Sequence, residues 1–107
     1  MKNVLILGAG ISGCACANAL SKAGFSTTIL EKGRGVGGRM ATRRMEGARI
    51  DHGAQFMTVR HPRMQSYLSG WLKDQVVCPW YERVPNREDL PVGERFRGMD
   101  GMTSPVK

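Results

Sequence analysis

The first thirty residues follow the hydrophobic pattern of a strand, a turn, a helix and a second strand. Residues 4–7 are an unbroken apolar run, which is typical of a parallel strand covered on both faces. Residues 14–23 are rich in alanine and other small residues, and Gly24 is placed to end this predicted helix as a left-handed cap. Residues 25–30 mix threonine with apolar side chains and predict a second strand that ends at Glu31. The order predicts a βαβ unit.

The second half of the chain begins with the pattern of an amphipathic helix. Apolar side chains in residues 63–74 recur at the i, i+3, i+4, i+7 and i+8 spacing of a helix, and we expect them in the core. They are Met64, Tyr67, Leu68, Trp71 and Leu72. His61 and Pro62 stand before this segment and predict the start of the helix.

Shorter apolar segments separated by turn residues follow this helix. Residues 76–84 predict one strand, or two short ones interrupted by Pro79, and residues 94–97 predict another. Between them, residues 85–93 are polar and hold proline, asparagine and glycine, which predicts a turn or loop. Residues 103–105 have the sequence of a helix cap and first turn, and the chain ends two residues later. We therefore expect the chain to be an incomplete fragment of a longer protein.

Three glycines connect the first predicted strand to the helix with the spacing Gly-x-Gly-x-x-Gly. Gly8 permits a tight turn, Gly10 lets the backbone approach a pyrophosphate, and Gly13 lets the helix lie close on the strand. The N-terminus of the helix would then present free N–H groups to the phosphates. Glu31 lies 18 residues beyond Gly13 and can accept hydrogen bonds from ribose hydroxyls. This context predicts a dinucleotide site, and glycines that serve only close packing are the alternative.

Composition and charge indicate one small globular domain with a local basic segment. The chain has 107 residues, of which 41% are hydrophobic and 23% charged, so neither disorder nor a fibre is expected. The net charge is +7, and residues 32–63 alone hold eight bases and two acids. Charge confined to one third of the chain predicts a local anionic partner. Cys14, Cys16 and Cys78 are too few for a disulfide scaffold and wrongly spaced for a metal site.

The basic segment also bears on which dinucleotide is bound. Residues 32–38 are too rich in glycine for a stable helix or strand, so they predict a loop. Gly37 and Gly38 would allow a second close backbone approach to an anion, and Arg39 offers a planar fork for phosphate oxygens. An NAD site needs no such second clamp, and Glu31 disfavours the 2′-phosphate of NADP through like-charge repulsion. FAD is therefore the predicted cofactor.

A nucleic-acid-binding arm is the alternative interpretation of the same segment. Its phosphate contacts would be Arg34, Arg39, Arg43, Arg44 and Arg49. Residues 26–55 contain no aromatic side chain on which bases could stack, so no nucleic-acid partner is predicted. Arg43 and Arg44 are expected to be surface charges.

Asp51 and His52 are adjacent, and they do not predict a proton-transfer pair. Neighbouring residues on an extended chain point to opposite sides, so their side chains cannot reach each other. We expect Asp51 to bond backbone N–H groups and hold the turn at Gly53 and Ala54. His52 is expected to be structural or exposed.

Several motifs together resemble those of the flavin-containing amine oxidases. Glu31-Lys32, followed by Gly-Gly-Arg-Met-Ala-Thr at 37–42, is similar to the second FAD motif of that family. Residues 51–56 are similar to the motif that follows it in the renalase-like branch, and residues 96–102 are similar to the stretch that precedes the substrate domain. The resemblance implies an α/β fold, a Rossmann-like FAD/NAD(P)-binding βαβ domain of the glutathione-reductase-like type.

The same resemblance implies roles for individual residues. It implies a ribose contact at Glu31, a contact near the adenine at Lys32, a second clamp at Gly38 and Arg39, and residues 53–55 close to the isoalloxazine ring. The cofactor-binding residues that it implies are Gly8, Gly10, Ile11, Ser12, Gly13, Glu31, Lys32, Gly38, Arg39, Met40, Gly53, Ala54, Gln55 and Phe56. Residues 1–56 would form the FAD-binding core, and residues 57–107 would lead toward a substrate domain.

The function that the resemblance implies is that of a FAD-dependent oxidoreductase in the complete protein. Hydride would pass from an amine or a reduced nicotinamide to the flavin and then to oxygen, and a non-catalytic or truncated NAD-binding module is the alternative. No catalytic residue is predicted in this chain, and neither a metal nor a membrane partner is expected. Residues 3–21 lack charge, but three glycines interrupt them, which favours folded cytoplasmic protein over a secretory signal.

Overall fold

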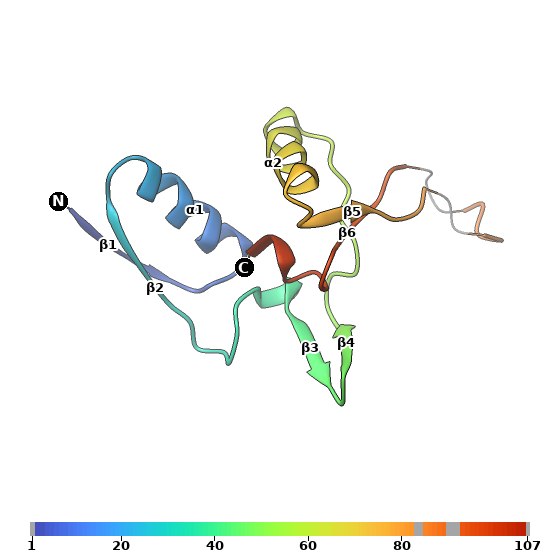
Figure 1. Cartoon of the computed structure of the whole chain (residues 1–107), viewed down its shortest axis with the longest axis horizontal. Coiled ribbons are helices and arrows are strands. Elements are labelled where there is room, and N and C mark those ends of the chain that lie inside the picture. The colour runs from blue at the N-terminus through green and yellow to red at the C-terminus, as the bar shows by residue number, and fades with distance from the viewer. Residues whose placement is uncertain (1, 83–84, 90–92, 107) are drawn as a thin grey trace.

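The part of the chain that the structure describes folds into three separate two-stranded sheets, two helices and two short 3-10 turns (Figure 1). The computed structural model describes residues 2–82, 85–89 and 93–106. In chain order the elements are β1 (Asn3–Leu7), α1 (Ile11–Lys22), β2 (Ser26–Leu30), η1 (Gly38–Met40), β3 (Thr42–Met45), β4 (Ala48–Asp51), α2 (Pro62–Lys73), β5 (Val77–Pro79), β6 (Phe96–Gly98) and η2 (Ser104–Val106). The order begins with the predicted βαβ unit.

The βαβ unit pairs β1 with β2 in parallel, with Asn3 opposite Ser26 and Leu7 opposite Leu30. Helix α1 packs on one face of this sheet, where alternate β1 side chains are half-buried. On the other face Leu5 is 58% and Leu7 is 78% exposed. The expectation of a strand covered on both faces is therefore wrong for the described chain, because the only helix that packs on this sheet lies on one side.

Glycines lie just outside both ends of helix α1. It starts at Ile11, directly after the extended Gly10, which is earlier than the predicted start at residue 14. At the other end Gly24 adopts φ +90°, and the Phe25 N–H donates to the Leu20 carbonyl at 3.0 Å. Such a bond across a left-handed glycine is the Schellman motif, so the predicted left-handed cap is confirmed.

The basic segment contains a hairpin that the sequence pattern did not indicate. Residues 32–36 form the predicted loop, but strands β3 and β4 pair in antiparallel fashion soon after it. The two-residue connection, Glu46 and Gly47, has positive φ at both positions, which is the geometry of a tight type I′ turn. The strands escaped detection because arginines occupy them without the alternation of apolar and polar residues that marks a strand.

A small core forms where α2 covers β5 and β6. Leu68, Val77 and Phe96 are buried, and Trp71 packs partly buried against them. The rest of the predicted apolar stripe does not reach this core, since Met64, Tyr67 and Leu72 are 37%, 43% and 36% exposed. The prediction that the whole stripe is core is therefore wrong. Two strands offer a surface only wide enough for part of the helix.

The ends of these elements agree in part with the sequence pattern. His61 caps α2, because its Nδ1 accepts a hydrogen bond from the Arg63 N–H at 3.1 Å. The strand predicted at 76–84 is shortened to β5, and residues 83–84 lie outside the described chain. The strand predicted at 94–97 forms two residues later as β6, and one turn of helix begins at Ser104 as expected.

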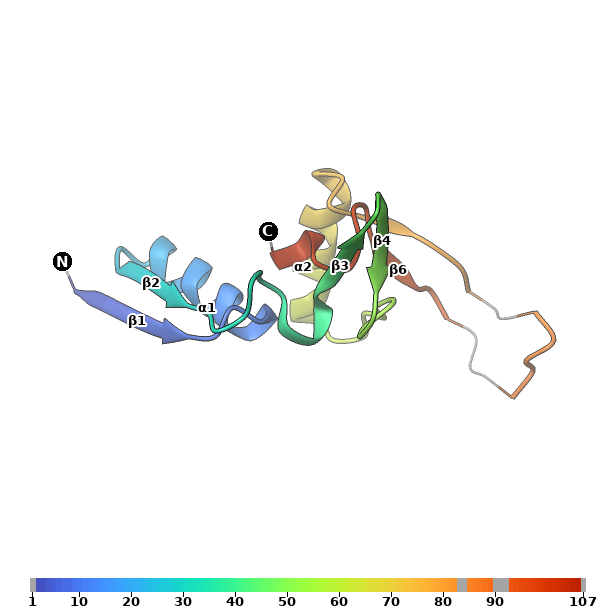
Figure 2. The same cartoon turned by 90° about the horizontal axis from the view of Figure 1, so that it is seen from below.

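The molecule is elongated, as Figure 2 shows, because its elements do not share one core. Its principal extents are 55 × 37 × 24 Å and its radius of gyration is 15.6 Å. A compact domain of this length has a radius of gyration of about 13 Å. The βαβ unit and the α2 core are therefore joined mainly by the loop before η1 and by the segment leading to η2.

Replacement of Leu68 by alanine tests this division of the α2 stripe. Leu68→Ala removes a side chain that is only 5% exposed, and we expect the free energy of unfolding to fall by about 2–5 kcal/mol. Leu72→Ala on the same helix should change it by less than about 1 kcal/mol, because that side chain is already partly in water. If urea denaturation showed that Leu68→Ala and Leu72→Ala lose the same free energy of unfolding, the placement of the core at Leu68 would be contradicted.

Candidate cofactor site

The first glycine turn leaves β1 and enters α1, and it favours glycine at its two ends for different reasons: a left-handed backbone at Gly8 and a lack of space at Gly13. Gly8 adopts φ +104°, and its N–H donates to the Leu30 carbonyl at 2.7 Å. A Cβ on Gly13 would overlap the Gly8 carbonyl oxygen, so the helix lies as close to the strand as predicted. A Cβ on Gly10, in contrast, would meet nothing within 4 Å. Gly10 therefore presents bare backbone to open space.

The second glycine loop is hydrogen-bonded to the first. The Gly37 N–H donates to the Ala9 carbonyl at 2.7 Å, and Gly37 forms an isolated parallel bridge with Gly10. Gly37 is buried and adopts φ +114°, and a Cβ on Gly38 would lie 3.5 Å from the Gly10 Cα atom. The two loops that the sequence places far apart thus lie against each other, and the left-handed backbone of the second loop, with φ +114° at Gly37 and +56° at Gly38, favours glycine there.

The two loops line one groove of about 410 Å³ at the N-terminus of α1. Its lining residues are Leu7, Gly8, Gly10, Ile11, Ser12, Gly13, Gly37, Gly38, Arg39 and Met40. No side chain caps the helix start, and the first N–H groups of any α-helix lack partners within the helix. The groove holds the cation of Arg39 and no carboxylate, so its chemistry favours an anion such as a diphosphate.

An adjoining hollow contains the acidic residue at the end of β2. This hollow is lined by Leu7, Gly8, Leu30, Glu31 and Lys32 and shares its first two residues with the groove. Glu31 accepts hydrogen bonds from backbone N–H groups, from Ala9 at 2.6 Å and from Gly33 at 3.0 Å.

Those two bonds determine the charge and the remaining capacity of Glu31. They lower the pKa of the carboxyl group below its ordinary value, the bond from Ala9 more strongly than the bond from Gly33. Each carboxylate oxygen accepts one bond and keeps a further lone pair, which suits a ribose hydroxyl. The ionised group would repel a 2′-phosphate, so the residues present fit a dinucleotide without one.

The segment at 53–56 approaches the site from behind Arg39. The Ala54 N–H donates to the Arg39 carbonyl at 2.9 Å, and a Cβ on Gly53 would overlap that same carbonyl oxygen. Gln55 is exposed and lines neither hollow. The Phe56 ring lies 6.1 Å from the Tyr81 ring, in an edge-on arrangement, and also lines neither hollow. Ten of the predicted residues therefore line the two hollows, Gly53 and Ala54 contact the backbone of Arg39 from behind, and Gln55 and Phe56 lie aside.

Asp51 contacts different partners from those predicted. Its Oδ1 accepts a hydrogen bond from the Thr42 hydroxyl at 2.6 Å and another from the Met102 N–H at 2.9 Å. It does bond a backbone N–H, but it does not hold the turn at Gly53 and Ala54, so that part of the prediction is wrong. The reason is that the fold brings Met102, which lies far from Asp51 in the sequence, next to the Asp51 carboxylate.

Two residues that shape the site were not predicted from the sequence, and a third, Gly37, was predicted only in part. Gly37 was expected to allow a close backbone approach to an anion, although it was not counted among the binding residues. Thr42 and Thr103 exchange hydrogen bonds directly behind that loop. The spacing from Gly37 to Thr42 was visible in the sequence, but nothing local to Thr103 marks a partner 61 residues away.

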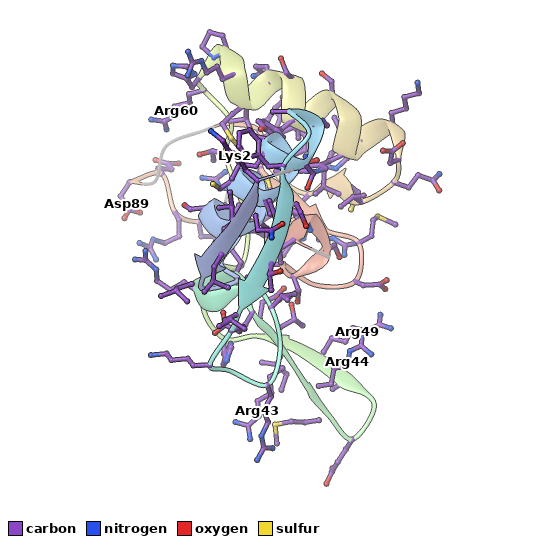
Figure 3. The ribbon with its side chains drawn as sticks, turned by 90° about the vertical axis from the view of Figure 1, so that its left-hand side faces the viewer. Lys2, Arg43, Arg44, Arg49, Arg60 and Asp89 are labelled. Carbon is purple, nitrogen blue, oxygen red and sulfur yellow. The ribbon has the colours of Figure 1, made fainter. Side chains whose placement is uncertain are left out.

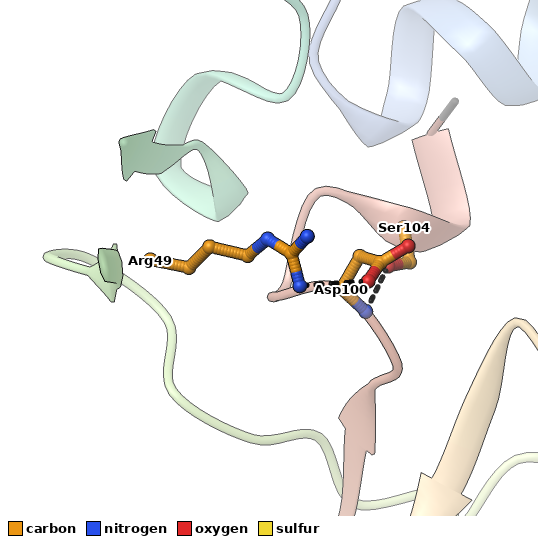
Figure 4. Close-up of polar contacts among 3 residues, drawn as sticks. All are labelled: Arg49, Asp100 and Ser104. Atoms are coloured by element: carbon orange, nitrogen blue, oxygen red, sulfur yellow. Dashed lines mark hydrogen bonds and ion pairs between the residues drawn. The ribbon is translucent and has the colours of Figure 1, made fainter. Parts of the chain in front are cut away.

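The arginines of the hairpin lie away from the groove. Figure 3 shows Arg43, Arg44 and Arg49 on β3 and β4, and all three are exposed, as predicted for the first two. Arg49 forms an ion pair with Asp100 at 2.9 Å, and the Asp100 N–H bonds the Ser104 hydroxyl at 3.0 Å (Figure 4). Exposed pairs of this kind contribute about 0–1 kcal/mol, so this pair adds little to the stability of the hairpin.

Two further properties concern the described residues as a whole. No helix in residues 2–82, 85–89 and 93–106 is long and apolar enough to cross a membrane. Within the same ranges, no group of three or more histidine, cysteine, aspartate or glutamate side chains could hold a metal ion.

Parallel strands joined by a helix, with a glycine turn at its start and an acid at the end of the second strand, define a dinucleotide-binding domain of the Rossmann type. The chain belongs to the family of NAD(P)-binding Rossmann-like domains, whose family model matches residues 6–71. This confirms the predicted fold class.

Curated relatives of the chain include several oxidases and desaturases. The polyamine oxidase 4 of Oryza sativa subsp. japonica is 47% identical over 55 residues, which is 51% of this chain and 11% of that protein. The phytoene desaturase of Fusarium fujikuroi is 43% identical over 56 residues, which is 52% of this chain and 10% of that protein. The chain spans about a tenth of the length of the curated relatives it matches.

Solved structures are similar over a larger part of the chain. Wild-type putrescine oxidase bound to putrescine aligns with a TM-score of 0.57 and 36% identity, covering 76% of this chain and 17% of that one. These relatives and structures confirm the resemblance to the flavin amine oxidase family. The match indicates a flavin or another dinucleotide as the cofactor of this domain.

The pH dependence of stability tests the hydrogen bonds to Glu31. Because the folded-state pKa is lowered, the carboxylate contributes fully above its ordinary pKa of about 4.3, and this contribution is lost as the pH falls through the lower folded value. Glu31→Gln should therefore melt below the wild type near pH 7, and the two melting temperatures should converge below about pH 4. If the difference in melting temperature between Glu31→Gln and the wild type stayed the same from pH 7 to pH 3, the hydrogen bonds assigned to the Glu31 carboxylate would be contradicted.

Proposed function

We propose that this chain binds FAD and forms the diphosphate- and ribose-binding part of a flavin-dependent oxidoreductase. The observation that carries the proposal is the Gly37 N–H bond to the Ala9 carbonyl. It joins two glycine loops around the start of α1, so that helix N–H groups and Arg39 line the same groove. A doubly negative diphosphate is the part of a dinucleotide that such a groove suits best.

The roles of the groove residues follow from their position. The N–H groups of Ile11, Ser12 and Gly13 would donate to diphosphate oxygens, because they are the first of α1 and have no partners within the helix. Arg39 would add charge-assisted hydrogen bonds from its planar guanidinium group. Gly10 and Gly38 would let the phosphates approach the backbone closely.

The choice of FAD over other dinucleotides rests on two features. Glu31 would accept hydrogen bonds from the adenosine ribose, with Lys32 on the adenine side of the same hollow, and its charge disfavours NADP. The second clamp, formed by Gly38 and Arg39, exceeds what NAD requires. The backbone at Gly53, held behind Arg39, would then lie on the path toward the isoalloxazine ring.

A bound flavin would supply hydride transfer, and this chain would supply binding and orientation. We propose an amine as the substrate of the complete protein, since the solved relative was bound to putrescine and a curated relative is a polyamine oxidase. A reduced nicotinamide is the other hydride donor that the sequence suggested. No catalytic residue is assigned in this chain, because no titratable side chain other than Arg39 lines the groove.

The absorption spectrum of the purified protein tests the proposal against a colourless NAD-binding module. Protein that retains FAD will be yellow, or will become so on reconstitution, and will melt at a higher temperature with FAD than with NAD. A colourless protein stabilised by NAD and not by FAD would favour the module instead. A salt-sensitive shift on DNA with no response to either dinucleotide would favour the nucleic-acid arm.

Two substitutions test the groove. Gly10→Ala adds a methyl group where the chain itself offers no atom within 4 Å, so the cofactor-free protein should melt within a few degrees of the wild type. Its FAD dissociation constant should rise at least about tenfold, because the methyl group fills the space of the diphosphate. Arg39→Ala should weaken FAD binding by about 10–100-fold through the loss of charge-assisted hydrogen bonds.

Matched controls separate binding from folding. Arg43→Ala removes the same charge from the exposed hairpin and should leave the FAD dissociation constant within about twofold. Gly13→Ala should instead lower the melting temperature of the cofactor-free protein, because its Cβ would overlap the Gly8 carbonyl. Wild-type FAD affinity in both Gly10→Ala and Arg39→Ala would contradict the proposed site.

A further inference from the structure

Two threonines far apart in sequence clasp each other behind the second glycine loop. The Thr42 N–H donates to the Thr103 Oγ1 at 3.1 Å, and the Thr103 N–H donates to the Thr42 Oγ1 at the same distance. Thr103 is only 5% exposed. We use the name threonine clasp for Thr42 and Thr103 together with Asp51 and the Met102 N–H group. That N–H group donates a hydrogen bond to Asp51.

Asp51 sets the direction of the hydrogen bonds in the clasp. Its Oδ1 accepts from the Thr42 hydroxyl at 2.6 Å, so the single hydroxyl proton of Thr42 points to Asp51. The Thr42 oxygen is then free to accept from the Thr103 N–H. The same Oδ1 accepts from the N–H of Met102, a residue that is 1% exposed. Each of these donors is satisfied, which makes the buried arrangement favourable.

The clasp is in direct contact with the loop that lines the groove. Thr42 follows the η1 turn, which carries Arg39, by two residues. The Thr103 Cγ2 atom lies 3.0 Å from the point where a Cβ on Gly37 would stand, so its methyl group packs against the backbone of that loop. Gly37 in turn is bonded to Ala9. A continuous path therefore runs from Asp51 to the first glycine turn.

We propose that Thr42, Asp51 and Thr103 are positioning residues for cofactor binding, a role that rests on the proposed function of the groove. By holding the backbone at Gly37 and Thr42, on either side of the η1 turn, the clasp keeps Arg39 and Gly38 in the arrangement that accepts the diphosphate. Without it, only a fraction of the molecules would hold the loop in place, and the observed dissociation constant rises in inverse proportion to that fraction.

Paired variants separate positioning from simple loss of packing. Thr42→Val keeps the size of the side chain, removes the hydroxyl and leaves the Thr103 N–H without its acceptor, whereas Thr42→Ser keeps the hydroxyl. We expect the FAD dissociation constant, measured by quenching of flavin fluorescence, to rise about tenfold in Thr42→Val and to stay within about twofold of the wild type in Thr42→Ser.

A second pair tests the same point at Asp51. The carbonyl oxygen of an asparagine can accept both bonds, so Asp51→Asn should bind FAD within about threefold of the wild type, and Asp51→Ala should lose about tenfold or more. This pair decides the question if Thr42→Val does not fold. Equal FAD affinities in Asp51→Ala and Asp51→Asn would overturn the proposal.

A measurement on the cofactor-free protein separates this inference from the proposed function. Hydrogen exchange of the Gly37 N–H reports whether its bond to Ala9 is kept, and we expect it to be about tenfold faster in Thr42→Val than in Thr42→Ser. If the wild type bound no FAD, the proposed function would fail, and faster exchange in Thr42→Val would still support the clasp. Unchanged exchange in Thr42→Val would overturn the clasp whether or not FAD binds.

Discussion

A single buried residue, Ala9, connects the parts of the site through its backbone. Its N–H donates to Glu31 at the end of β2, and its carbonyl accepts from Gly37 in the second glycine loop. Ala9 is 2% exposed, so these two backbone groups have little access to water. Glu31, the helix N-terminus and the turn that carries Arg39 are held in register through this one residue. Loss of either bond would separate surfaces that the proposed function assigns to one ligand.

The weakness of the surrounding packing makes these polar connections more important. Few large side chains of the described chain are fully buried, and the β1–β2 sheet leaves Leu7 and Leu30 in water on one face. Hydrogen bonds between loops therefore replace part of the packing that would otherwise fix their relative positions. A ligand that bridges both loops would stabilise the folded state in proportion to its occupancy. Binding of the proposed cofactor would thus be coupled to folding of this domain.

Local patterns in the sequence were sufficient for the βαβ unit and for much of the groove. The glycine spacing, the apolar run before it and Glu31 are all set within one short segment, so each could be identified from its neighbours. The β3–β4 hairpin could not, because arginine-rich strands lack hydrophobic alternation. The distant partners of Asp51 and Thr42 could not either, since Met102 approaches Asp51, and Thr103 approaches Thr42, only through the tertiary fold. The prediction that the whole apolar stripe of α2 lies in the core failed, because the burial of a stripe depends on the width of the surface that the helix covers.

The most direct test of the central claim is a crystal structure of this chain grown with FAD. We expect the diphosphate in the groove, with its oxygens about 2.7–3.2 Å from the N–H groups at the start of α1 and from the guanidinium group of Arg39. The Gly37 bond to the Ala9 carbonyl should be unchanged. A flavin nucleotide bound elsewhere, or a groove filled by the chain's own side chains, would contradict the account.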